Sequence, residues 1–378
     1  MTPIYRNFNI VNGQEDLEHL HTFENFPVFM GCTTDDPSTD VCCDMSWYIS
    51  KSTGMIQLNP LVPEEVLYAQ GHGAGSVGKI WQEHHREFSK FIGKLNPASV
   101  LEIGGGHGLL SLYYKEIDNI PWTIVEPNPH PATGVTARYI KGFFDDKFAV
   151  DEDYDLVVHS HVFEHVFEPD KFFQHLSTYV QPGKRIAFTL PNMKAMLERY
   201  YTNCINFEHT LFLTEPYIEH ILSKNGFEIE DREYFMEDHS IFYVAVRNSL
   251  ATLIDLPDDI ADANREMFFD YINYYQKLVQ DINSVTSSTS KPVFMFGAHI
   301  FSQSLIGFGL DTSKIQFLLD NDTNKHERRL YGTNLIVKSP KILASVENPL
   351  IILKAGVYNN EIREDILTNI NPHAEFLE

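Results

Sequence analysis

Two acidic residues and a group of glycines have the types and spacing of a nucleotide-cofactor site. Residues 100–108 read Val-Leu-Glu-Ile-Gly-Gly-Gly-His-Gly, and Glu126 ends a second apolar run about twenty residues later. Glycines at 104, 106 and 108 permit backbone angles that other residues avoid and let amide groups approach a ligand. An acid at the end of the second strand suits a ribose diol, so Glu126 is the expected ribose clamp. Glu102 would repel a pyrophosphate but suits an ammonium group, which favours S-adenosylmethionine over NAD.

A parallel sheet of the Rossmann type must position these residues. Residues 98–248 alternate strand-like and helix-like runs, which predicts helices on both faces of such a sheet. A helix is expected from about Val77 to Leu95, leading into the glycine motif.

These motifs together resemble the class I methyltransferases that use S-adenosylmethionine. Tyr154–Val166 resembles the fourth strand of that family and the loop after it, and Gln181–Phe188 resembles the turn into the fifth strand. The resemblance implies that cofactor contacts come from Glu102, Gly104, Gly106, Gly108, Glu126, Pro127 and His161.

A second, smaller α/β unit is expected near the end of the chain. Asp258–Asp281 has helical spacing, and the serine-rich residues 284–290 are expected to form a linker. Strand-like runs then predict a Rossmann-like unit whose single glycine favours a structural domain over a second nucleotide site. The predicted segments are an N-terminal module at 1–75, a methyltransferase domain at 76–250, a helix and linker at 251–290 and a C-terminal domain at 291–378.

This order of parts resembles the sugar C-methyltransferases that act on nucleotide-linked deoxysugars. Residues 320–333 follow that family's C-terminal signature, residues 207–209 lie at its Tyr-His-Glu-His segment, and residues 238–240 lie near its His-Gly-Gly-Ser. The implied fold is α/β: a Rossmann-like class I methyltransferase core with a small N-terminal module and a second C-terminal Rossmann-like domain. The implied substrate is a nucleotide-activated sugar, or a related precursor of a surface polysaccharide or secondary metabolite.

The N-terminal module departs from that family. Members usually hold zinc there through paired Cys-x-x-Cys motifs, but Ser50 and Thr53 occupy two of the cysteine positions. Hydroxyls are poor zinc ligands compared with thiolates, so no metal is expected. Hydrophobic packing must then stabilise the module in place of the metal. The side chains expected to supply it are Phe26, Phe29, Trp47, Tyr48 and Met55. A site rebuilt from Cys32, Cys42 and Cys43 with a histidine is the alternative.

The expected active site departs from the family as well. Asn206 and Phe207 replace the tyrosine and first histidine of Tyr-His-Glu-His, whereas Glu208 and His209 remain. An imidazole with a pKa near 6.5 accepts a proton at neutral pH, so His209 is the predicted general base, with Glu208 as its partner and His239 or His72 as the alternatives. The lost tyrosine shifts the expectation from C-methylation towards O- or N-methylation, and all three acceptor atoms stay open.

Three further patterns each have two interpretations. The glycine-rich residues 71–79 are either a lid over the cofactor or a flexible connector. The basic residues Lys325, Arg328, Arg329 and Lys338 either bind a diphosphate or form a solvated face. His161 and His165 have the i, i+4 spacing of a zinc site, but the resemblance assigns His161 to the cofactor pocket and favours a packing role for His165.

Composition narrows the classes of protein. The 378 residues carry a net charge of −23, which disfavours nucleic acid and anionic membranes as partners. No run of 18 apolar residues occurs, and four cysteines give no disulfide framework, so a cytoplasmic enzyme with a small-molecule substrate is expected, as a monomer or weak homodimer. The alternatives are a non-catalytic scaffold that keeps the cofactor fold and an NAD-linked oxidoreductase.

Overall fold

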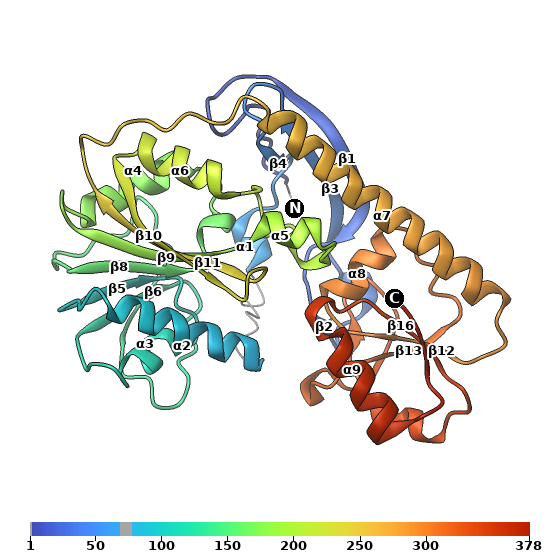
Figure 1. The fold of residues 1–378 in the computed structure, drawn as a ribbon. Helices are drawn as coiled ribbons and strands as arrows, with labels where there is room; N and C mark the ends of the chain where they lie inside the picture. Colours follow the sequence, from blue (N-terminus) through green and yellow to red (C-terminus); the bar gives the residue numbers. More distant parts are fainter. Residues whose placement is uncertain (1, 69–77) are drawn as a thin grey trace.

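The structure is a computed structural model that describes residues 2–68 and 78–378 (Figure 1). The predicted lid at residues 71–77 and the alternative base His72 lie outside the described residues. Within the described residues, no helix has both the length and the apolar character needed to cross a membrane.

A seven-stranded sheet forms the centre of the chain, in the order β10-β11-β9-β8-β5-β6-β7. The five strands β5 to β9 run parallel, and β10 and β11 form an antiparallel hairpin that joins the sheet at β9. The strands are β5 (Val100–Ile103), β6 (Trp122–Glu126), β7 (Arg138–Lys141), β8 (Leu156–Ser160), β9 (Arg185–Pro191), β10 (Phe227–Phe235) and β11 (Ser240–Arg247).

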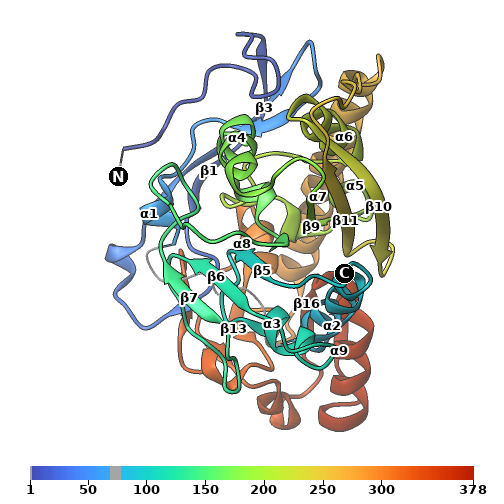
Figure 2. The same cartoon turned by 90° about the vertical axis from the view of Figure 1, so that its left-hand side faces the viewer.

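Helices cover both faces of this sheet, as the alternating pattern predicted (Figures 1 and 2). Side chains alternate between the faces: Leu101 and Val157 pack under α4 and α6, whereas Val100 and Val158 pack under α2 and α3. The helices are α2 (Lys79–Gly93), α3 (Leu109–Tyr114), α4 (Pro169–Tyr179), α5 (Met193–Glu198) and α6 (Glu215–Lys224). The helix α2 confirms the prediction before the glycine motif and lies two residues inside each expected end.

The N-terminal segment shares one hydrophobic core with the C-terminal part of the chain. Trp47 of the N-terminal sheet, Phe268 of α7 and Met295 of β12 all belong to this core. The N-terminal elements are β1 (Leu17–Pro27), β2 (Cys32–Thr33), β3 (Cys42–Ser50), β4 (Ile56–Leu58) and the short helix α1 (Glu64–Leu67). The sheet order is β1-β3-β4, and β2 pairs separately with β14 of the C-terminal domain.

The serine-rich residues 284–288 are helical, so their interpretation as a linker is wrong. Helix α7 (Ile260–Ser288) continues through them as one rod between the domains (Figure 1). The hydroxyl of Ser288 donates to the carbonyl of Ser284 at 3.1 Å, within the helix. Thr286 faces the core and is only 2% exposed. Burial of this face outweighs the weak helix propensity of serine and threonine.

The C-terminal domain is a second parallel α/β unit, as predicted. Its five-stranded sheet has the order β15-β13-β12-β16-β17. The elements are β12 (Val293–Phe296), α8 (Ile300–Gly307), β13 (Ile315–Leu319), β14 (Arg329–Leu330), β15 (Val337–Lys338), β16 (Leu350–Leu353), α9 (Asn359–Asp365) and β17 (Glu375–Leu377).

Candidate cofactor and active site

The glycine turn after β5 needs glycine at the positions that the sequence singled out. Gly104, Gly106 and Gly108 have φ values of 69°, 49° and 73°, in the left-handed region. A Cβ atom on Gly104 would lie 2.7 Å from Val162, and one on Gly108 would lie 2.5 Å from the hydroxyl of Tyr139. A Cβ atom on Gly106 would meet none of the described residues within 4 Å, so among them this turn borders open space that a ligand can fill.

Glu126 is held at the carboxyl end of β6 by two backbone amides. Its Oε2 atom accepts a hydrogen bond from Gly106 N, and its Oε1 atom accepts one from Asn128 N, both at 3.0 Å. Pro127 is half-buried directly after it. The carboxylate therefore fixes the glycine turn, and its contact with a ribose diol stays a prediction.

The C-terminal domain uses an acid in the same way. Asp320 accepts a hydrogen bond from Ala298 N at 2.9 Å and also pairs with Lys325 Nζ at 3.0 Å. In both domains an acid at the end of the second strand therefore holds the turn after the first strand by a hydrogen bond from a backbone amide. In the C-terminal domain, however, Lys325 of the same loop neutralises the charge of Asp320. The expectation that this domain binds no nucleotide stays a prediction.

Glu102 is buried beneath the glycine turn and is 2% exposed. Its Oε2 atom accepts a hydrogen bond from Trp122 Nε1 at 2.6 Å, and a Cβ atom on Gly105 would lie 2.7 Å from its carboxyl carbon. Burial raises the pKa of Glu102 to about 7. The carboxyl group thus supports the turn, and its pairing with an ammonium group stays a prediction.

The segment that carries Glu208 and His209 is shaped by Asn206. The Asn206 side-chain oxygen accepts hydrogen bonds from Glu208 N at 2.8 Å and His209 N at 3.0 Å. Phe207 is buried against Phe26 of β1. The two departures from the family motif therefore have structural roles here, in a tight turn and in the core shared with the N-terminal sheet.

A buried arginine holds this turn against the loop after β8. Arg6 donates to Phe167 O at 2.9 Å, Thr210 O at 2.9 Å and Leu58 O at 3.2 Å. Burial lowers its pKa to about 9. The sequence analysis missed Arg6, because its partners lie as far as 204 positions away along the chain.

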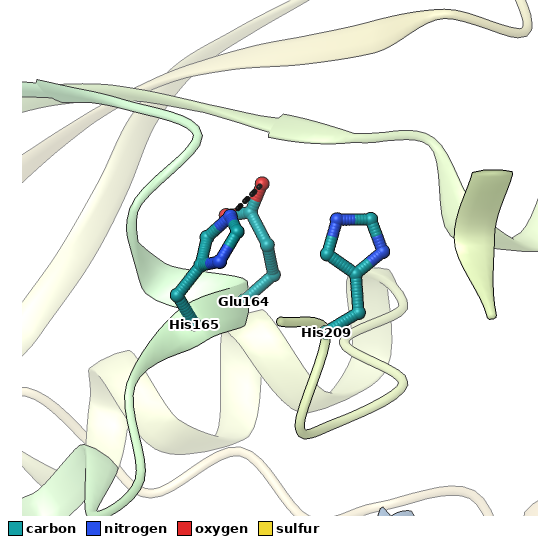
Figure 3. Close-up of side chains that lie close together, drawn as sticks. All are labelled: Glu164, His165 and His209. Atoms are coloured by element: carbon teal, nitrogen blue, oxygen red, sulfur yellow. Dashed lines mark ion pairs between the residues drawn. The ribbon is translucent and has the colours of Figure 1, made fainter. Parts of the chain in front are cut away.

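The fold brings His209 together with Glu164 and His165 (Figure 3), and Glu208 lies beside His165. Glu164 is fully buried, and its Oε1 atom lies 3.8 Å from His165 Nε2. Oε2 of Glu208 lies 3.7 Å from His165 Nδ1. Tyr68 adds a hydroxyl 3.2 Å from His165 Nδ1, and its carbonyl accepts a hydrogen bond from Asn128, two residues after Glu126.

Part of this cluster was absent from the sequence analysis. Glu164 and Tyr68 were not singled out, and His165 belongs to the cluster rather than only to the packing of a helix start. The signal was the His-x-x-Glu-His spacing of residues 161–165 directly after a buried strand. Tyr68 had no comparable local signal.

His209 has the orientation of a proton acceptor. Its Nδ1 atom lies 3.1 Å from the carbonyl oxygen of Cys204. A carbonyl oxygen can only accept a hydrogen bond, so Nδ1 must carry the hydrogen that it donates. The proton of the neutral ring is thus on Nδ1, and Nε2 keeps its lone pair. Burial lowers the pKa of His209, and the charge of Glu164 partly opposes this shift. The ring is neutral at neutral pH.

Three of these side chains also have the atom types of a metal site. The ligand atoms of Glu164, His165 and His209 lie within 4.8 Å of one another. Bonds of about 2.0–2.2 Å to a tetrahedral ion would bring such atoms to roughly 3.4 Å apart. The three ligand atoms are thus near enough for a metal to be considered, and the absence of a metal stays our prediction.

His161 turns its ring towards Glu164 and Ser240. Nδ1 lies 3.1 Å from Glu164 Oε1, and Nε2 lies 3.0 Å from Ser240 Oγ. Its predicted contact with the cofactor is not tested by this arrangement.

A hydrogen-bond network joins Ser50 and Thr53, the two residues predicted to stand at cysteine positions. The side-chain amide of Asn9 donates to Ser50 Oγ at 2.8 Å and Thr53 Oγ1 at 2.9 Å. Ser50 Oγ in turn donates to Asp16 Oδ2 at 2.9 Å. Burial raises the pKa values of Cys32 and Cys43 to about 11, so both thiols stay protonated at neutral pH.

The predicted basic group in the C-terminal domain is largely paired with acids. Arg329 forms a buried bidentate salt bridge with Asp40 of the N-terminal segment, at 2.6 and 2.7 Å. Lys338 pairs with Glu327 at 2.6 Å, and Lys325 pairs with Asp320. These pairs join loops and domains, which disfavours a diphosphate site made by these residues.

Comparison with known proteins gives one family match. Residues 79–231 match the family model described as a methyltransferase domain. A search of curated proteins found no match.

Several solved structures are similar to this chain at low identity. An S-adenosylmethionine-dependent methyltransferase from Clostridium acetobutylicum ATCC 824 has 12% identity and a TM-score of 0.35, over 43% of this chain and 92% of that one. The plantazolicin methyltransferase BpumL, in complex with a pentazolic desmethylPZN analog and SAH, has 12% identity and a TM-score of 0.38, over 49% and 91%. The glycopeptide N-methyltransferase MtfA has 14% identity and a TM-score of 0.35, over 43% and 95%.

The family match and the geometry agree on the central domain. The matched residues include the glycine turn, Glu102 and Glu126, and they end in β10. Open space at Gly106 among the described residues, next to an acid held at the end of β6, leaves room for a cofactor at this turn. The chain is a methyltransferase enzyme with a Rossmann-like catalytic domain, and its cofactor is S-adenosylmethionine.

Proposed function

We propose that the enzyme methylates a hydroxyl or amino group of a nucleotide-activated sugar, or of a related polysaccharide or secondary-metabolite precursor. One observation carries the proposal: the turn with Glu208 and His209 is anchored to the loop after β8, at the edge of the sheet that carries the glycine turn. The anchor is the hydrogen bond from Thr210 N to Glu164 O at 3.1 Å. The nucleotide-linked class of acceptor rests on the sequence resemblance.

His209 is the proposed general base. S-adenosylmethionine supplies an activated methyl group, and an in-line displacement needs the acceptor atom aligned with it and water excluded. The acceptor proton passes to the lone pair on His209 Nε2, and the imidazolium that forms lies beside Glu164 and Glu208. With Asn206 committed to the turn, one base without a tyrosine partner suits O–H or N–H acceptors better than C–H acceptors.

Calorimetry with S-adenosylmethionine and S-adenosylhomocysteine tests whether the chain binds the proposed cofactor. We expect one site per chain, and no binding at high micromolar concentration would support the scaffold alternative. Titration with NAD tests the oxidoreductase alternative, for which we expect no heat.

The proposed class of methyl acceptor is tested by transfer of labelled methyl groups from S-adenosylmethionine. The acceptors are a panel of UDP- and dTDP-linked hexoses, aminohexoses and deoxyhexoses. We expect label in at least one sugar nucleotide, and mass spectrometry of the product then identifies the methylated atom. Cofactor binding with no labelled sugar nucleotide across the panel would overturn the proposed acceptor class, and a C-methyl product would overturn the preference for oxygen or nitrogen.

A further inference from the structure

A chain of hydrogen-bonding groups runs from the buried active site to the surface turn between β10 and β11. His161 lies 3.1 Å from Glu164 through Nδ1 and 3.0 Å from Ser240 through Nε2. Ser240 Oγ lies 2.6 Å from His239 Nδ1. His239 is partly exposed and follows the exposed Met236 and Glu237 of the turn. The buried carboxylate is thus connected to the outside of the domain through two imidazoles and one hydroxyl.

The centre of this chain is held in a defined geometry. Ser240 is 0% exposed, so its hydroxyl has no competing solvent. His161 has a φ of 53°, a left-handed conformation that is unfavourable for a residue with a Cβ atom. Its backbone N–H donates to Thr189 O at 2.9 Å. Strained residues of this kind persist where the surroundings hold them, and they cluster at functional sites.

The chemistry of Ser240 couples the two imidazoles. A hydroxyl has one hydrogen to donate, so Ser240 donates to one ring and accepts from the other. In one ordered state both rings carry their proton on Nδ1, and all hydrogens point towards Glu164. In the other state both rings carry it on Nε2, and all hydrogens point towards the surface. A mixed pair of tautomers would break the chain.

We propose that Glu164, His161, Ser240 and His239 form a proton relay between the active site and solvent. The inference rests on the proposed function for the source of the proton, which His209 takes from the acceptor. Nε2 of His209 then passes it to Glu164, whose ligand atom lies within 4.8 Å, a gap that one water bridges. With both rings in the Nε2 state, Glu164 donates this proton to His161 Nδ1, His161 Nε2 passes one to Ser240, Ser240 passes one to His239 Nδ1, and one leaves from His239 Nε2. The transfer leaves both rings protonated on Nδ1, and they return to the Nε2 state before the next turnover. The relay ends with Glu164 ionised and His209 neutral.

Such a path serves the base once the site is filled. His209 is half-buried in the free chain, and a bound cofactor and acceptor would close off its remaining contact with solvent. Other titratable groups face the relay: His84 and His85 on α2 near His161, Asp238 beside His239, and His165 near Glu164. None of them interrupts the three contacts that form the relay.

The tautomers test the relay without an acceptor. We would label the full-length protein with ¹⁵N-histidine, saturate it with S-adenosylhomocysteine at pH 7.5 and assign the rings of residues 161 and 239 from His161→Gln and His239→Gln spectra. We expect neutral rings that carry their protons on the same type of nitrogen, with Nδ1 in both while Glu164 is ionised. Opposite tautomers, or a doubly protonated His161, would overturn the proposal.

Exchange of the His161 ring proton with water tests proton flow. We expect Ser240→Ala to slow this exchange by about tenfold or more, because the relay loses its central hydroxyl. Thr189→Val is the matched control: it removes a buried hydroxyl that lies 3.1 Å from His84 and outside the relay, so exchange should stay unchanged. Equal exchange rates in wild type and Ser240→Ala would overturn the relay. Calorimetry on the same samples reports cofactor binding separately, and labelled methyl transfer reports the acceptor, so failure of the proposed function is distinguishable.

Discussion

The carboxylate of Glu126 accepts a hydrogen bond from the backbone N–H of Gly106 at 3.0 Å, which joins the end of β6 to the turn after β5. The second carboxylate oxygen accepts from Asn128 N, and the Asn128 side chain donates to Tyr68 O at 3.2 Å. Tyr68 in turn contacts His165. A continuous set of contacts therefore connects the glycine turn with the cluster of Glu164, His165, Glu208 and His209.

Replacement of Glu126 should weaken cofactor binding. Glu126→Ala removes a charged acceptor from Gly106 and from the ribose, so we expect affinity for S-adenosylmethionine to fall about 10- to 100-fold. Calorimetry measures this directly. Glu116→Ala, which changes an exposed acid after α3, is the control and should bind as wild type. Wild-type affinity in Glu126→Ala would mean that the acid only braces the turn, as Asp320 does.

Replacement of His209 should reduce turnover and leave cofactor binding intact. His209→Ala removes the only proposed base, and we expect kcat to fall by about 10²- to 10⁴-fold on the sugar nucleotide found in the acceptor panel. The Kd for S-adenosylmethionine should stay within about twofold of wild type, because the ring binds Cys204 O and not the glycine turn. His373→Ala on the C-terminal surface is the control. Full activity in His209→Ala would move the base elsewhere, with His239 next.

The cofactor turn was predictable from sequence because its signals are local. Three glycines with positive φ, an apolar strand on each side and an acid at a fixed spacing are requirements of one βαβ unit. The alternation of apolar runs likewise predicted the parallel strands of both domains. Glu208 and His209 became candidate active-site residues through a resemblance over a short motif.

The rest of the site depends on contacts between distant segments. Arg6, Tyr68, Glu164 and Ser240 come from four separate regions, and tertiary packing alone brings them to the Glu208–His209 turn or its relay. The helix at residues 284–288 was not predicted for a related reason. Burial of Thr286 in the core stabilises the helix there, although serine and threonine have weak helix propensity.

Cofactor affinity should depend on pH through Glu102. Its pKa is raised to about 7 by burial, so the carboxyl group is largely protonated at pH 6 and ionised at pH 8. An ammonium group is attracted to the ionised form, so we expect affinity for S-adenosylmethionine to rise between pH 6 and pH 8. Calorimetry at the two pH values should show the rise in wild type and a flat, weaker response in Glu102→Gln. A rise that persists in Glu102→Gln would assign the pH dependence to another group.

Acid should destabilise the protein through its buried histidines. Burial lowers the pKa of His159 to about 3 and those of His85 and His239 to about 4, whereas an unfolded histidine titrates near 6.5. Below pH 6.5 the unfolded chain therefore binds protons that the folded chain does not, and stability is lost as the pH falls. At pH 5.5 we expect a loss of about 1 kcal/mol for each of these rings.

Thermal unfolding at pH 7.5 and pH 5.5 checks this expectation. The Tm of wild type should fall, and His159→Phe, which keeps a ring next to Phe188, should reduce the fall. His373→Gln alters an exposed ring and should leave the difference unchanged. Equal pH sensitivity in wild type and His159→Phe would show that His159 titrates normally in the folded chain.

Asn9 should stabilise the N-terminal module in place of a metal. Its amide bonds Ser50 and Thr53 in a buried network, so Asn9→Ala should lower the free energy of unfolding by about 1–3 kcal/mol. Gln14→Ala is the control, because Gln14 is an exposed amide of the same segment and should change stability by less than about 0.5 kcal/mol. Purified wild type should contain no stoichiometric zinc, and EDTA should leave its Tm unchanged. One equivalent of zinc by elemental analysis, with a Tm that falls in EDTA, would show that the module is held by a metal after all, with Cys32, Cys42 and Cys43 as the first residues to replace.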